Sequence, residues 1–108
     1  MAETIIEEDL SNPTAATETT LYQVASGARA VVGGIVICNR NASARTIKIK
    51  KTDSSNTLVA QIVAGYSLAA NDTIMIPKGK IGLKNQQKIR VESSGADVDF
   101  SLVAIERT

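Results

Sequence analysis

The sequence predicts an all-β protein: an antiparallel, jelly-roll-like β-sandwich of about eight strands with an extended N-terminal arm. Three observations indicate this fold. Short apolar or alternating segments are separated by turn-forming residues at intervals of roughly 8–12 residues. No segment keeps a helical period of apolar residues. The apolar residues are mostly Val, Ile, Leu and Ala, with aromatic residues at only 3%, and such an aliphatic core suits two thin, packed sheets.

The expected arm spans residues 1–18 and precedes a sandwich domain, 19–108. It contains five of the eleven acidic residues and none of the twelve Lys and Arg residues. Its apolar cluster is followed by a turn-rich linker at Pro13. The arm is either a loose terminus or a segment docked on its own body, on a neighbouring subunit or on a larger particle. The apolar cluster and the acidic charge favour docking on a neighbour.

Strands of the domain are expected at residues 20–25, 29–38, 44–52, 57–64, 73–77, 80–84, 87–93 and 97–106. Residues 46–50 alternate polar and apolar side chains, which is typical of a strand with one buried and one wet face. The segments 88–92 and 97–104 alternate in the same way, and they place Phe100 in the core. A short turn of helix is an alternative for residues 64–70.

The apolar run 30–38 differs because it has apolar side chains on both faces. Val31, Ile35 and Ile37 are expected on one face, and Val32, Val36 and Cys38 on the other. A strand of this kind is normally covered on both sides, so the arm or another subunit should supply the second cover. This predicts a homo-oligomer, a trimer or larger ring. The two glycines at 33–34 predict a bulge or a close backbone approach.

Interface candidates follow from the arm, the doubly apolar strand and the two tyrosines. They are Ile5, Ile6, Leu10, Val32, Val36, Cys38, Tyr22 and Tyr66.

Residue types that carry catalysis or bind metals are scarce in this chain. It has no histidine and one cysteine, so the commonest general base and transition-metal ligand is missing. Cys38 is expected to act as a buried small apolar residue, and an intermolecular disulfide is the alternative. Asp97 and Asp99 share a strand face, where a solvated surface is favoured over an acid–base pair or a cation site. No catalytic, cofactor-binding or metal-binding residue is therefore assigned.

Two basic regions, residues 45–51 and 78–90, follow the arm in the sequence. No aromatic residues alternate with these bases for stacking, and the net charge is only +1, so nucleic acid is not an expected partner. A solvated sheet face or a surface for the acidic arms of neighbours are the two interpretations. The sequence has no apolar run of about 18 residues and no basic leader. We therefore expect no membrane partner, and we expect the protein to assemble in a cytoplasm.

Several strings of the domain resemble a known group of proteins. They are Thr19-Thr20-Leu21-Tyr22-Gln23-Val24 with Gly27 and 30–32, then 35–39 and 44–46, and later Leu68-Ala69-Ala70-Asn71-Asp72-Thr73. The chain resembles small β-rich accessory proteins from the virion gene clusters of tailed bacteriophages, of the head decoration, neck or minor tail type. The resemblance covers about residues 19–105, and Ala25-Ser26 departs from it where a proline is expected.

This resemblance implies a non-enzymatic virion protein that assembles as a homo-oligomer on the particle. It would serve as capsid decoration or cement, or as a neck or collar component. Its partners would be copies of itself and major capsid, neck or tail proteins, with no cofactor. A tail-fibre or baseplate adaptor and a carbohydrate-binding β-module remain the alternatives.

Overall fold

The computed structural model describes residues 3–76 and 81–108, and within them the backbone forms nine strands and no helix. The strands are β1 (Glu3–Ser11), β2 (Thr19–Gln23), β3 (Arg29–Asn39), β4 (Arg45–Thr52), β5 (Leu58–Leu68), β6 (Thr73–Ile76), β7 (Ile81–Leu83), β8 (Lys88–Ser93) and β9 (Val98–Arg107).

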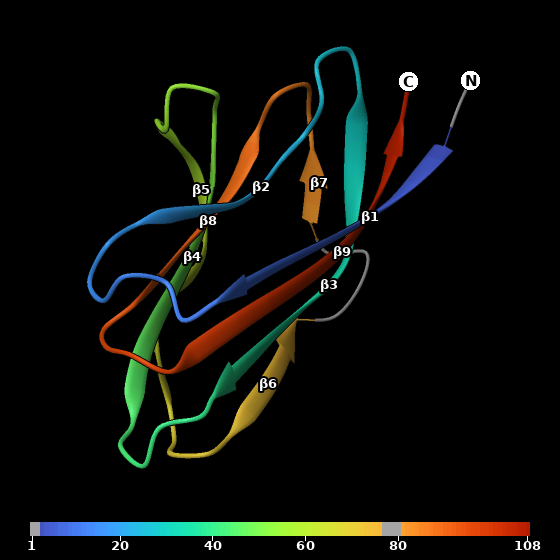
Figure 1. Cartoon of the computed structure of the whole chain (residues 1–108). Helices are drawn as coiled ribbons and strands as arrows, with labels where there is room; N and C mark the ends of the chain where they lie inside the picture. The colour runs from blue at the N-terminus through green and yellow to red at the C-terminus, as the bar shows by residue number, and fades with distance from the viewer. Residues whose placement is uncertain (1–2, 77–80) are drawn as a thin grey trace.

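These strands form two antiparallel sheets packed as a sandwich (Figure 1). Sheet A has the order β1-β9-β3-β6, with β7 also paired to β3, and sheet B has the order β2-β8-β4-β5. The chain changes sheet at most connections, and β4 and β5 form a hairpin within sheet B. This strand order is that of a jelly roll, so the predicted fold class is confirmed.

The core lies between the sheets and is built from alternate residues of their strands. Ile47 and Ile49 of β4 and Ile89 of β8 are fully buried in sheet B. They meet the inward series of β9, in which Val98, Phe100, Leu102 and Ala104 are at most 1% exposed. The alternation in the sequence predicted each of these orientations, because successive side chains of a strand point to opposite faces.

Each expected strand has a counterpart among the described residues, and residues 77 and 80, at the ends of the expected strands 73–77 and 80–84, lie outside them. One strand is longer than expected and one strand is additional. β5 continues to Leu68 where a helical turn was an alternative for residues 64–70; bulges in its pairing with β4 and a positive φ at Gly65 let the strand bend instead of ending. The ninth strand, β1, lies where an arm was expected. It pairs with β9 over its whole length, from Glu3 with Arg107 to Ser11 with Asp99.

The structure therefore places residues 3–11 on the chain's own sheet. Ile6 and Leu10 face the core beside Ala104 and Phe100 of β9 and are half-buried. Residues four apart in a strand lie on the same face, so this spacing is compatible with a strand. The three residues between them are all acidic, so the sequence does not show an alternation of apolar and polar side chains here. The division of the chain into an arm, residues 1–18, and a domain that folds without it, residues 19–108, stays a prediction.

The glycine pair in β3 forms the expected bulge, and this bulge corrects the assignment of faces. The register with β9 shifts between Val32 and Gly34. Even-numbered residues therefore face the core before the bulge, and odd-numbered residues face it after the bulge. Val32, Ile35 and Ile37 face the core, whereas Val31, Val36 and Cys38 point outward. The prediction had exchanged Val31 and Val32, because it continued a strict alternation through the bulge.

Candidate interaction surface

The outer face of sheet A carries a contiguous set of exposed aliphatic side chains. Ile5, Ile105 and Val31 lie in one row across β1, β9 and β3, because Ile105 pairs with both of the others. Val103 is the next outward residue of β9. These four side chains are 72%, 42%, 52% and 45% exposed, respectively, and they are called the apolar patch below. Exposed apolar surface that is contiguous, and not scattered, is typical of an interaction site.

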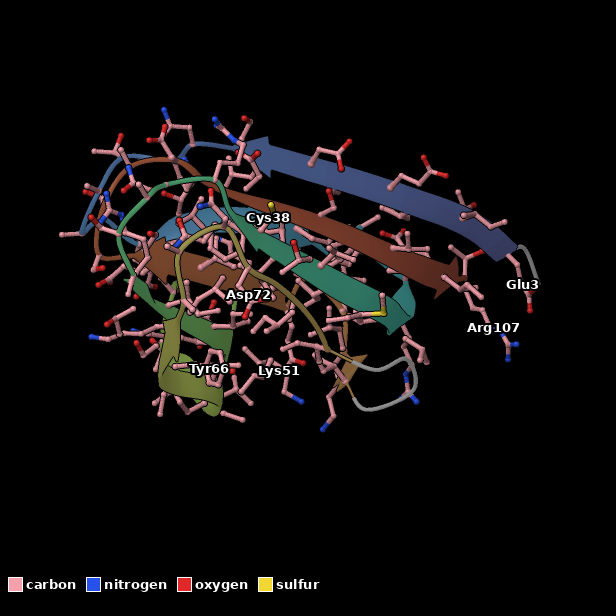
Figure 2. The ribbon with its side chains drawn as sticks, turned by 90° about the horizontal axis from the view of Figure 1, so that it is seen from below. Glu3, Cys38, Lys51, Tyr66, Asp72 and Arg107 are labelled. Atoms are coloured by element: carbon pink, nitrogen blue, oxygen red, sulfur yellow. The ribbon has the colours of Figure 1, made fainter. Side chains whose placement is uncertain are left out.

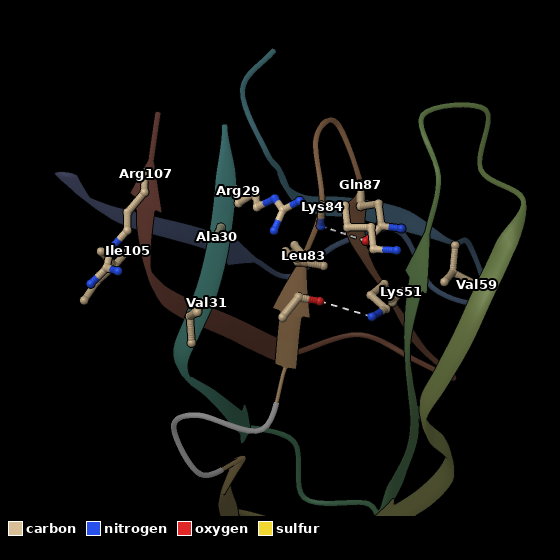
Figure 3. Close-up of a pocket in the computed structure, with 11 residues that line it drawn as sticks. Arg29, Ala30, Val31, Lys51, Val59, Leu83, Lys84, Gln87, Ile105 and Arg107 are labelled. Carbon is tan, nitrogen blue, oxygen red and sulfur yellow. Dashed lines mark hydrogen bonds between the residues drawn. The ribbon is translucent and has the colours of Figure 1, made fainter. Parts of the chain in front are cut away.

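A basic groove continues the apolar patch toward sheet B (Figure 3). It has a volume of about 720 Å³, and Val31 and Ile105 form one of its sides. It is lined by Arg29, Ala30, Val31, Lys51, Val59, Gly82, Leu83, Lys84, Gln87, Ile105 and Arg107. A Cβ atom on Gly82 would meet no other atom within 4 Å, so the backbone of β7 forms an open floor. The Nζ of Lys51 donates a hydrogen bond of 3.1 Å to the carbonyl oxygen of Gly82 and so links β4 to β7.

The lining of the groove includes four basic residues and no acidic residue. Among the described residues, no carboxylate lies within 4.0 Å of the charged groups of Arg29, Lys51 or Lys84, and Arg107 pairs with Glu3 at 2.8 Å. Arg29 and Arg107 are direct cross-strand neighbours, and like charges in that position repel each other. The groove therefore has an uncompensated positive charge.

The opposite edge of the same face is acidic. β1 is the edge strand of sheet A, and Glu3 lies at its start (Figure 2). Its outward side chains include Glu3, Glu7 and Asp9. Within the described residues neither Glu7 nor Asp9 forms an ion pair; Asp9 accepts a hydrogen bond from Ser101 instead. Across the outer face of sheet A, an acidic edge is thus followed by an apolar centre and a basic groove.

The predicted interface candidates occupy different environments. Ile5 is exposed in the apolar patch, and Val36 and Cys38 are half-buried on the same outer face. Ile6 and Leu10 are half-buried on the inner side of β1, and Tyr66 is exposed on β5.

Two candidates lie in the core and do not reach the surface. Val32 is 1% exposed because of the bulge, and Tyr22 is 4% exposed. The hydroxyl of Tyr22 donates a hydrogen bond to the carboxylate of Glu106. Burial, together with this carboxylate, raises the pKa of Tyr22 well above its usual range.

Sequence reasoning missed Val103 and Ile105 as surface residues. The segment Leu102-Val103-Ala104-Ile105 is apolar on both faces, as residues 31–38 are, and this signal could have identified them. The groove itself was beyond sequence reasoning, because its bases come from distant positions: from β3, β4 and β9, and from Lys84, which follows β7.

The basic residues 45–50 and 90 mostly neutralise acidic residues of the chain itself. Glu18 lies between Lys50 and Arg90 at 2.6 Å from each. The hydrogen bond from Lys50 lowers the pKa of the Glu18 carboxyl, and the hydrogen bond from Arg90 lowers it to a smaller extent. Burial raises this pKa and so partly opposes both effects. This end of the expected arm therefore docks on its own body.

Asp97 and Asp99 both pair with Arg40, at 3.8 Å and 2.7 Å. Beside this guanidinium, the pKa of Asp99 lies below its usual range. Within residues 3–76 and 81–108, no three His, Cys, Asp or Glu side chains gather closely enough to hold a metal ion. The described part of the chain also contains no helix long and apolar enough to cross a membrane.

The fold is similar to that of several solved structures. One is from the Bacillus endospore appendages, which form a family of disulfide-linked pili; its TM-score is 0.60 at 14% identity, over 99% of this chain and 87% of that one. A second, from the T13 particle of infectious bursal disease virus, has a TM-score of 0.49 at 14% identity, over 96% of this chain and 30% of that one.

A third is a pentameric capsid protein from metagenomic phage sequences, with a TM-score of 0.36 at 22% identity, over 93% of this chain and 60% of that one. At these identities the similarity concerns the fold alone, and of these three structures the appendage structure has a TM-score above 0.5. No model of a protein family matches the chain, and no curated protein matches its sequence. The fold therefore defines a class, the small jelly-roll sandwich, without assigning a family.

Proposed function

We propose that this protein is a non-enzymatic structural component of a bacteriophage virion, which assembles with copies of itself on the particle as a decoration, cement, neck or collar protein. The observation that carries the proposal is the apolar patch at the centre of the outer face of sheet A, with Val31 52% and Ile105 42% exposed. A free subunit would leave this surface in water, whereas a subunit in an assembly would bury it.

Two further findings support this function. The strings at residues 19–46 and 68–73 resemble those of tailed-phage accessory proteins, and the jelly roll is a fold that capsid proteins use. The solved structure with the TM-score of 0.60 belongs to a pilus, which is also a repeating protein assembly. These findings support a role in assembly, and the place in the virion is part of the proposal.

The proposal is tested by following the protein through particle purification. Particles from cells that produce the chain are banded in a density gradient, and the fractions are probed with an antibody against residues 19–108. We expect the protein to co-sediment with intact particles and to appear as symmetric density in cryo-electron microscopy of those particles. Protein that stays at the top of the gradient, with particles that lack it, would overturn the proposal.

One observation favours a second candidate, a carbohydrate-binding module. Tyr66 is 47% exposed on β5, and sugar rings often stack on exposed aromatic side chains. The other two aromatic residues, Tyr22 and Phe100, are buried, so a platform of several rings is missing. Binding on a glycan array that is lost in Tyr66→Ser would favour this second function.

A further inference from the structure

We propose that two copies of this chain bind face to face through the outer faces of sheet A, so that the acidic β1 of each copy lies over the basic groove of the other. This inference rests on the proposed function, because it assigns the contact by which the copies assemble. The occupant of the groove is a second copy of the chain.

The order of charges across the face carries the argument. From β1 to the groove, the face carries the unpaired Glu7 and the ion pair of Glu3 with Arg107, then the apolar Ile105 and Val31, and then the bases Arg29 and Lys84. A two-fold axis parallel to the strands reverses this order in the second copy. It places β1 of each copy over the groove of the other, and it places Ile105 and Val31 of the two copies against each other in the centre. Arg107 of each copy then lies over Arg29 of the other, and its charge is already paired with Glu3. A contact of this type is self-complementary, as a two-fold interface requires.

Groups left without partners in one copy support the same arrangement. Within the described residues, Arg29, Lys51 and Lys84 lack a carboxylate partner, and Glu7 lacks a basic partner. The bases line the groove at one edge of the outer face of sheet A, where Lys51 comes from β4 of sheet B, and Glu7 lies at the opposite edge on β1. A single subunit therefore does not bring the two sets together. The second copy would supply the missing partner for each.

The size of the face is also suitable. Strands of nine to eleven residues are about 30 Å long, and four strands side by side, at about 5 Å each, are about 20 Å wide. The resulting footprint of about 600 Å² approaches the roughly 800 Å² per partner of a standard interface. Sheets packed face to face lie about 10 Å apart, a distance that the side chains of Val31 and Ile105 from two copies can fill.

A charge-reversal experiment tests the orientation. One variant carries Glu3→Lys and Glu7→Lys, so that its acidic edge becomes basic. The second carries Arg29→Glu and Lys84→Glu, so that its groove becomes acidic. Neither should bind itself, because equal charges would then face each other, but the two should bind one another. In sedimentation velocity we expect each variant alone to dimerise at least about tenfold more weakly than wild type, and the mixture to recover a dimer.

A matched pair of substitutions tests the centre of the contact. Val31→Glu places a charge in the apolar patch, and Leu58→Glu places one on β5, where the side chain is similarly exposed at 55% against 52%. Both variants are compared by circular dichroism to confirm that they fold. We expect Val31→Glu to abolish the dimer and Leu58→Glu to leave it within about threefold of wild type.

The outcomes separate this inference from the proposed function. Equal effects of Val31→Glu and Leu58→Glu, or a mixture of reversed variants that stays monomeric, would overturn the face-to-face contact. A trimer or ring that persists in Val31→Glu would do the same, while the virion role would stand on the gradient result. A wild-type monomer at micromolar concentration would also overturn the contact in solution.

Discussion

At the scale of single residues, the core depends on one large side chain. Phe100 is the sole phenylalanine, is 1% exposed and lies in the inward series of β9. Phe100→Ala should lower the free energy of unfolding by about 3–5 kcal/mol, a large share of the roughly 5–15 kcal/mol typical of a domain. Urea denaturation followed by circular dichroism measures this loss.

The control for this substitution is on the same strand. Val103→Ala truncates an outward side chain that is 45% exposed, and we expect a loss below about 1 kcal/mol. Equal losses for the two variants would contradict the orientation of β9.

The ion pairs of Glu18 should make stability depend on pH. Its side chain is 23% exposed, between Lys50 and Arg90 at 28% and 15%, and its folded-state pKa lies below the ordinary value of 4.5. A carboxyl with a lowered pKa stabilises the folded state fully above its ordinary value, and this stabilisation is lost as the pH falls through the folded-state pKa.

Glu18→Gln should therefore lower the free energy of unfolding at pH 7 by about 1–2 kcal/mol. The difference from wild type should shrink as the pH falls below 4.5. Thermal unfolding over this pH range measures it, with Glu7→Gln as the control outside the ion pairs. A difference that stays constant down to low pH would show that the carboxylate charge is not the cause.

At the scale of elements, the bulge in β3 decides which residues the surface presents. A Cβ on Gly33 would lie 3.2 Å from the carbonyl oxygen of Val103, so the glycine permits the close approach of β3 and β9. Gly33→Val should cost about 1–3 kcal/mol, because the added side chain forces the backbones apart.

Gly82→Ala is the matched glycine control, since a Cβ there meets nothing within 4 Å. It should leave the free energy of unfolding nearly unchanged in the same denaturation experiment. If Gly33→Val were as harmless as Gly82→Ala, the bulge would not be constrained by the approach of β9.

The edge strand β1 should be separable from the body. Only Ile6 and Leu10 of β1 pack against the core, and both are half-buried, so their loss should cost roughly 1.5–3 kcal/mol. Deleting residues 2–12 should leave residues 19–108 folded by circular dichroism, with a lower melting temperature. It should also weaken self-association, because the acidic edge is removed.

The double variant Ile6→Ser and Leu10→Ser is the comparison for this deletion. It keeps the acidic edge while removing the apolar anchor, so it should lower the melting temperature and spare more of the association. A deletion variant that is unfolded would show that residues 1–18 are not a separate unit.

At the scale of the whole molecule, association should depend only weakly on salt. The centre of the proposed contact is aliphatic, and only its rims are charged. Raising the ionic strength from about 0.1 M to about 1 M shortens the screening length from about 10 Å to about 3 Å. This should weaken the dimer by less than about tenfold, because the apolar patch remains buried. Sedimentation at both salt concentrations measures the change, and complete dissociation at high salt would mean that charge pairs alone hold the copies together.

The sequence by itself determined the all-β class, the strand positions within residues 19–108 and the inward faces of β4, β8 and β9. It could do so because the two-residue period of a strand and the chemistry of turns are local properties. It also indicated the bulge in β3, because paired glycines in a strand have few other uses.

Only the tertiary structure decided the character of the outer surface. The bulge exchanged Val31 with Val32, and the pairing of β1 with β9 turned an expected arm into an edge strand beside Ile105. The basic groove joins Arg29, Lys51 and Lys84 from three separated parts of the chain. These features depend on which strands pair and in which register, and that outcome is set by long-range packing between the two sheets, which no local pattern records.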